Sequence, residues 1–236
     1  MYSKDYETFV EGFHSALPTI LGYVGIGLAA GVVGTNAHLS VLEVALMSTL
    51  VYAGAAQFII CGLLLLHTAP QAIILTVFLV NLRHLLMSLS ASQLFQKESL
   101  LKGIGIGSLL TDESYAVLMT AAAKEKKVST SWMNGLNLTA YLSWIFSTVI
   151  GAVIGNWIPS PDRFGLDFAL VAMFAGLFVI QLEFQLSGKV KKYVMILSVV
   201  VVSLYGLMII VTPEIAVILG TLLGCLTGVI IDERNK

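Results

Sequence analysis

Polar side chains that could bind ions or carry protons lie in the middle of an otherwise apolar stretch. Asn81, Arg83 and His84 have apolar-rich sequence on both sides. An arginine at the centre of a bilayer costs roughly 2.5–3.5 kcal/mol on insertion scales. Arg83 must therefore face a carboxylate, backbone carbonyls or a water-filled cavity. On a helix, Asn81, His84 and Ser88 would share one face.

A second polar group, Asp112 and Glu113, interrupts another apolar segment. The simplest compensation pairs Arg83 with one of these acids, which leaves the other acid or His84 to exchange a proton. That combination is typical of a proton-coupled transporter. There are two structural alternatives. Arg83 and an acid could simply fix helix packing, or Thr111 or Asp112 could cap a helix at the membrane surface after an irregular segment at 103–108.

Three further residues complete the candidate site. Gly54 lies in an Ala-Gly element that could break a helix, and Gln57 could bind substrate or a neighbouring helix. Gln181 ends a later apolar segment, where it could serve the site or reach lipid headgroups. The candidate substrate-binding or proton-coupling residues are thus Gly54, Gln57, Asn81, Arg83, His84, Asp112, Glu113 and Gln181.

Composition indicates a protein whose main solvent is lipid. Hydrophobic residues make up 57% of the chain and charged residues 11%, against about a quarter charged in soluble domains. The net charge of −1 does not suggest a nucleic-acid partner. Cys61 and Cys225 lie in apolar runs without nearby histidines, so we expect neither a metal site nor a cofactor.

Apolar segments long enough to cross a bilayer need about 20 residues. We predict an all-α polytopic bundle in a single domain, residues 1–236, with about eight spans. Seven is the alternative, because the last segment is short. The first apolar segment has no cleavage site after it and is expected to be retained. The predicted spans are 15–36, 42–66, 71–94, 104–123, 133–158, 166–185, 193–211 and 215–231.

The distribution of Lys and Arg predicts cytoplasmic N- and C-termini. With eight spans, nine of the twelve Lys and Arg residues outside the spans are then cytoplasmic. Lys97, Lys102 and Arg163 are the exceptions. A re-entrant segment among the first three spans would move Lys97 and Lys102 inside and reverse the N-terminus.

A weak internal repeat relates the halves 15–123 and 133–231. Gly31 and Asn36 precede the Ala53-Gly54 element, and Gly151 and Asn156 precede an Ala175-Gly176 element about 121 residues later. We expect helices to break at both Ala-Gly elements, because transporter repeats often place the substrate at broken helices near the midplane. Glycines 220, 224 and 228 form a smooth ridge that predicts close packing, by default within the chain.

Four motifs in order resemble the AzlC-type branched-chain amino acid permeases. They are Leu17-Pro-Thr-Ile-Leu-Gly-Tyr23, Ala53-Gly-Ala-Ala-Gln-Phe58, Asn81-Leu-Arg-His84 and Thr111-Asp-Glu-Ser114. The resemblance covers most of the first half, and the second half matches in length and hydropathy. Gly25 departs from it, because many members have proline there.

The resemblance implies the large subunit of an exporter in a bacterial inner membrane. It implies export of valine, leucine, isoleucine or methionine, driven by the proton motive force, together with a small AzlD-like hydrophobic membrane subunit. A passive channel and a purely structural membrane subunit are the alternatives. We do not expect an enzyme, since Gly105-Ile-Gly-Ser108 is the nearest approach to a nucleophile or metal motif.

Overall fold

The computed structural model describes residues 7–123, 127–158, 190–211 and 213–234, and the single positions 168, 175 and 179. The chain divides into two compact units, Met1–Leu170 and Val171–Lys236. Helices make up 84% of the structure and the described residues contain no strand, so the prediction of an all-α fold is confirmed.

Two long helices, α1 (Phe9–Asn36) and α7 (Thr130–Gly155), form the scaffold of the first unit. Glycines bring their backbones into contact: a Cβ on Gly12 would overlap the backbone of Trp132, and one on Gly31 would overlap that of Thr148. Because residue numbers rise together along this contact, the two helices run parallel. Small residues allow such close approach.

The next two helices, α2 (Val41–Leu50) and α3 (Gly54–Leu65), form a hairpin. The Gln57 side-chain amide donates to the Met47 carbonyl oxygen at 3.2 Å, so the chain turns back on itself between them. At 1.5 Å per residue the helices measure about 15 and 18 Å, against about 30 Å for the hydrocarbon core. The break at Ala53-Gly54 was predicted, but the two halves of the predicted span 42–66 form a hairpin and do not continue in one direction.

The chain then crosses in α4 (Pro70–Ser92) and, after a 3₁₀ turn at Gln93–Phe95, enters a second hairpin, α5 (Leu100–Ser108) and α6 (Asp112–Ala123). Ser88 donates to the Gly107 carbonyl oxygen and Tyr115 donates to Ser90, so both arms lie beside one turn of α4. The continuous span predicted over 104–123 was therefore wrong, as was an irregular segment at 103–108.

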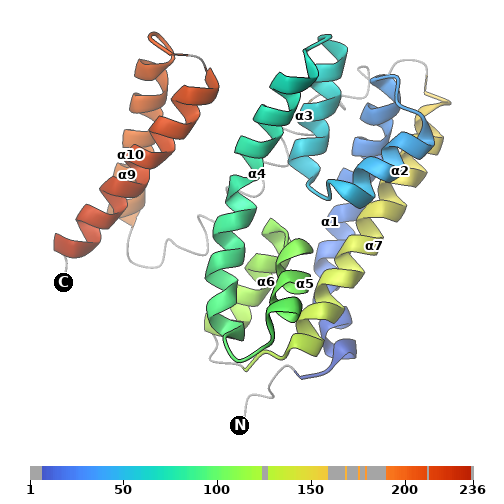
Figure 1. The fold of residues 1–236 in the computed structure, drawn as a ribbon, viewed down its shortest axis with the longest axis horizontal. Helices are drawn as coiled ribbons and strands as arrows, with labels where there is room; N and C mark the ends of the chain where they lie inside the picture. The colour runs from blue at the N-terminus through green and yellow to red at the C-terminus, as the bar shows by residue number, and fades with distance from the viewer. Residues whose placement is uncertain are drawn as a thin grey trace. The chain divides into compact units, whose positions relative to one another are not determined.

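The hairpins enter from opposite ends of the unit (Figure 1). The first follows the C-terminal end of α1, and the second follows the C-terminal end of α4, which runs antiparallel to α1: Phe95 packs in one cluster with Ala16, near the start of α1. Residues 9–65 and 70–123 thus repeat one order of elements, a long helix and then a hairpin, in opposite orientations. The repeat predicted between 15–123 and 133–231 stays a prediction.

The second unit contains α9 (Val190–Leu207) and α10 (Pro213–Arg234). A Cβ on Gly220 would contact Leu204, and one on Gly224 would contact Val200, so the helices are antiparallel. Intramolecular packing of the glycine ridge is thereby confirmed. The predicted span 166–185 and its Ala175-Gly176 break lie almost wholly outside the described residues.

Among the described residues, four helices are long and apolar enough to cross a membrane, by length and composition. They are Phe9–Asn36, Pro70–Phe95, Thr130–Gly155 and Val190–Leu207, and they correspond to the predicted spans 15–36, 71–94, 133–158 and 193–211. The apolar part of α10 is shorter, as expected for the last predicted span. The two hairpins are the main departure from the eight-span prediction.

Gly31→Ala tests the contact between α1 and α7. Its Cβ would overlap the Thr148 carbonyl oxygen, so we expect a loss of about 1–3 kcal/mol, as for other overpacked sites. Gly25→Ala on the same helix is the matched control, because a Cβ at Gly25 has nothing within 4 Å. Thermal unfolding in detergent should show a lower midpoint for Gly31→Ala alone; equal midpoints would contradict the packing.

The hairpins also predict which loops share a membrane face. A cysteine at His67 should react from the same side as one at His38, and cysteines at Glu98 and Lys127 should react from the other side. The measurement is labelling of intact cells with an impermeant maleimide, after Cys61 and Cys225 have been replaced. Eight full spans would instead place positions 38 and 67 on opposite sides.

Candidate functional site

An ion pair joins α4 to the tip of the second hairpin. A guanidinium nitrogen of Arg83 lies 3.0 Å from Asp112 Oδ2, and the two side chains are 29% and 12% exposed. Arg83 was expected to offset one of the two acids, and the structure selects Asp112. Asp112 is also the first residue of α6, where a carboxylate is favoured by the helix dipole.

The tip of the second hairpin is capped by its own side chains. The Ser114 amide donates to Thr111 Oγ1 at 3.3 Å, and the Thr111 amide donates to Ser114 Oγ at 2.9 Å. This reciprocal cap explains why α6 begins at Asp112. A cap at Thr111 was one sequence alternative, but it lies at the tip of a hairpin among buried residues, since Thr111 is 6% exposed and Ser114 fully buried.

The second acid, Glu113, is bound by a tyrosine of α1. The Tyr23 hydroxyl donates to Glu113 Oε2 at 2.8 Å and lies 2.9 Å from Thr111 Oγ1. The same carboxylate interacts electrostatically with Tyr52 and with His84. Asp112 and Glu113 therefore have different environments: one carboxylate offsets the arginine, and the other is held by a neutral hydroxyl.

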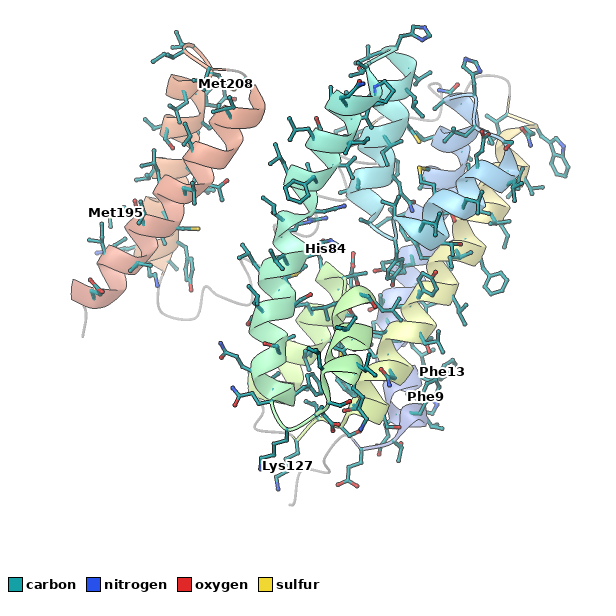
Figure 2. The ribbon with its side chains drawn as sticks, in the orientation of Figure 1. Phe9, Phe13, His84, Lys127, Met195 and Met208 are labelled. Carbon is teal, nitrogen blue, oxygen red and sulfur yellow. The ribbon has the colours of Figure 1, made fainter. Side chains whose placement is uncertain are left out.

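Two polar atoms of α4 lie buried near this ion pair. Asn81 Oδ1 and His84 Nε2 have no hydrogen-bond partner within the described part of the chain, and His84 lies half-way along α4 (Figure 2). Buried polar groups are normally hydrogen-bonded, so exceptions point to a water, an ion or a ligand. Arg83 and His84 are thus brought together with Asp112 and Glu113, and Asn81 lies on the same helix, three residues before His84.

Gln57 and Gly54 belong to the tip of the first hairpin and pack on α7. Gln57 is buried, donates to the Met47 carbonyl oxygen and accepts from Trp144 Nε1 at 3.2 Å. A Cβ on Gly54 would overlap the Trp144 ring. In this structure both residues anchor the hairpin, and a role in substrate binding stays a prediction. Gln181 lies outside the described residues.

Sequence reasoning missed the polar face of α7 that holds both hairpins. Asn137 donates to the Ile106 carbonyl oxygen of α5, and Tyr141 donates to the Thr49 carbonyl oxygen of α2. Thr148 lies within hydrogen-bonding distance, 2.7 Å, of Ser48. The spacing of these residues could have revealed this polar face, because positions 137, 141, 144 and 148 recur at the helical period within an apolar run.

Within the part of the chain that the structure describes, no group of three His, Cys, Asp or Glu side chains is positioned to hold a metal ion.

Comparison with known proteins assigns the chain to a family. The family model described as AzlC protein matches residues 18–158, which include both hairpins and the ion pair. The chain belongs to the AzlC family. Its membership confirms the resemblance carried by the four motifs.

Relatives in the AzlC family extend over most of the chain. The inner membrane protein YgaZ of Escherichia coli is 30% identical over 94% of this chain and 90% of its own length. The branched-chain amino acid transport protein AzlC of Bacillus subtilis is 25% identical over 76% of this chain and 70% of its own length. No solved structure matches. The chain is a membrane protein of this family.

The ion pair of this AzlC-family protein predicts non-additive effects on stability. Arg83→Ala and Asp112→Asn should each cost roughly 1–3 kcal/mol. That is less than for a fully buried pair, because Arg83 keeps 29% exposure. The double variant should lose clearly less than the sum of the single losses, since it leaves no unpaired charge. Unfolding of the purified variants measures this, and additive losses would exclude coupling.

Proposed function

We propose that this protein is a secondary transporter, and not an enzyme, that exports branched-chain amino acids. The observation that carries the proposal is a partly buried cluster of charges, Arg83, Asp112 and Glu113, where a full-length helix meets the tip of a half-length hairpin. The Bacillus subtilis relative is named as a branched-chain amino acid transport protein, which supports the choice of substrate.

The charged groups of the cluster could bind both ends of a zwitterionic amino acid. The Arg83 guanidinium carries five donors in a planar fork, which can hold Asp112 and a substrate carboxylate together. The first turn of α3 offers a second anion-binding group, because its N-cap, Ala53, has no side chain to cap the amides that follow. Glu113 supplies an anion for the substrate ammonium.

The two hairpins favour a carrier over a passive channel. They enter from opposite ends of the unit, and discontinuous helices that meet near the midplane are common in secondary transporters. Movement of one hairpin would expose the charged cluster to one side of the membrane while the other hairpin stays closed. In this scheme the proton motive force acts through Glu113 or His84, which lie at the cluster but outside the ion pair of Arg83 with Asp112.

The remaining expectations belong to the same proposal. The protein would reside in a bacterial inner membrane with a small AzlD-like subunit and cytoplasmic termini. Lys97 and Lys102 flank the end of α4 that packs near the start of α1, and Lys127 lies at this end too (Figure 2). With both hairpins re-entrant, Lys97 and Lys102 would lie on the same side as the N-terminus and would no longer be exceptions. All three lysines then support a cytoplasmic N-terminus. The Lys102 ammonium lowers the pKa of Glu98 there through a hydrogen bond.

Efflux measurements test the transport function. Arg83→Ala and Asp112→Asn should abolish valine efflux while the protein still inserts, because each removes a charge needed in the site. Lys102→Ala is the matched control, since it breaks an exposed ion pair with Glu98 that should contribute little. Normal efflux by both Arg83→Ala and Asp112→Asn would end the site assignment.

Counterflow in proteoliposomes separates the carrier from the alternatives. We expect labelled valine to accumulate in proteoliposomes that are preloaded with unlabelled valine. The flux is measured under an imposed pH gradient, and proteoliposomes with the small subunit are compared with proteoliposomes without it. Saturable flux that responds to the gradient supports a proton-coupled carrier. Fast flux that does not saturate would indicate a channel, and no flux in any preparation would indicate a structural role.

A further inference from the structure

Tyr52 occupies a costly backbone conformation at the break of the first hairpin. It lies between α2 and α3 with φ at +40°, a left-handed value that is uncommon for an aromatic residue. Such conformations cost of order 1–3 kcal/mol and cluster at functional sites. Tyr52 lies one residue before the N-cap of α3, so its side chain is a candidate for a functional role.

The Tyr52 hydroxyl is buried without a well-formed hydrogen bond. The residue is 7% exposed, and its ring packs edge-on against Tyr141 with 4.7 Å between the ring centroids. Its hydroxyl lies beside the hydroxyls of Tyr23 and Thr111, which already bind each other, and it makes no hydrogen bond of good geometry to a described residue. The hydroxyls of Tyr23, Tyr115 and Tyr141 each donate to a partner. A buried hydroxyl without a partner destabilises the folded state unless a ligand or water satisfies it.

The surroundings of Tyr52 select a cationic ligand. Tyr52 packs in one cluster with Tyr23, whose hydroxyl binds Glu113, and it interacts electrostatically with the Glu113 carboxylate. Arg83 and Asp112 offset each other, so Glu113 leaves the cluster with one net negative charge when ionised. An anion placed beside Glu113 would be repelled, whereas an ammonium group would be attracted.

We propose that the Tyr52 hydroxyl accepts a hydrogen bond from the primary ammonium group of the transported amino acid, beside Glu113. The assignment rests on the proposed transport function and adds a binding residue from the other hairpin. An ammonium has three donors, and Glu113 and Tyr52 supply acceptors from the tips of both hairpins. Binding the ammonium therefore joins the two hairpins through the substrate.

Tyr52→Phe isolates the hydroxyl, because the ring and its packing on Tyr141 are kept. We expect the apparent affinity for valine in counterflow to fall at least about tenfold, the change expected for a lost hydrogen bond to a charged group. The thermal midpoint should stay equal or rise, since the removed hydroxyl makes no hydrogen bond of good geometry to a described residue. Tyr115→Phe is the matched control: it loses a bond to Ser90, so it should lower the midpoint and leave the affinity unchanged.

Analogues identify which end of the substrate Tyr52 contacts. L-Valinamide keeps the ammonium and lacks the carboxylate, and 2-hydroxyisovalerate lacks the ammonium. In the wild type, valinamide should inhibit labelled valine counterflow and the hydroxy acid should not. In Tyr52→Phe, inhibition by valinamide should weaken by the same factor as that by valine.

The outcomes separate this inference from the transport proposal. Unchanged valine affinity in Tyr52→Phe, with active wild type, overturns the role of Tyr52 alone. If Tyr52→Phe weakens inhibition by valine but leaves inhibition by valinamide unchanged, the hydroxyl contacts the substrate carboxylate, and the proposed contact with the ammonium is overturned. Absence of amino acid flux in the wild type overturns the proposed function and this inference with it.

Discussion

The backbone contact between α1 and α7 is the constraint on which the rest of the first unit depends. Glycines on both helices, such as Gly31 and Gly151, remove the side chains that would hold the helices apart. Hairpins that end at half the depth of a bilayer expose backbone groups that lipid cannot satisfy, so protein must cover them. The α1–α7 pair does so: Tyr23 binds the tip of the second hairpin, and α7 binds both hairpins.

Charge placement follows from that scaffold. An arginine half-way along α4 is tolerated because the second hairpin brings Asp112 to it, at a depth where an isolated charge would be expensive. Glu113, the next residue, points to a different partner and is held by Tyr23. The two neighbouring acids thus have different roles. Asp112 compensates the charge of Arg83, and Glu113 is proposed to bind the substrate.

The errors in the sequence-based prediction have one physical source. Hydropathy reports whether a segment is apolar, and both 42–66 and 104–123 are largely apolar. Hydropathy does not report that the chain reverses at Tyr52 or at 109–111. Contacts with residues distant in the chain fix these reversals, such as the contact of Trp144 with Gln57. The Ala53-Gly54 break was visible because glycine weakens a helix locally. The reversal at 109–111 has no glycine to mark it.

The sequence by itself determined that the chain is an α-helical membrane protein of the AzlC family, that polar groups lie at membrane depth, and that Arg83 needs an acid. These conclusions depend on transfer energies and on motifs that are local in the chain. Only the tertiary structure decided that Asp112 is the partner, that the hairpins enter from opposite ends, and that Tyr23 and Tyr52 surround Glu113. Those facts depend on how α1 and α7 pack, which brings together residues about 90 positions apart in the chain, such as Tyr23 and Glu113.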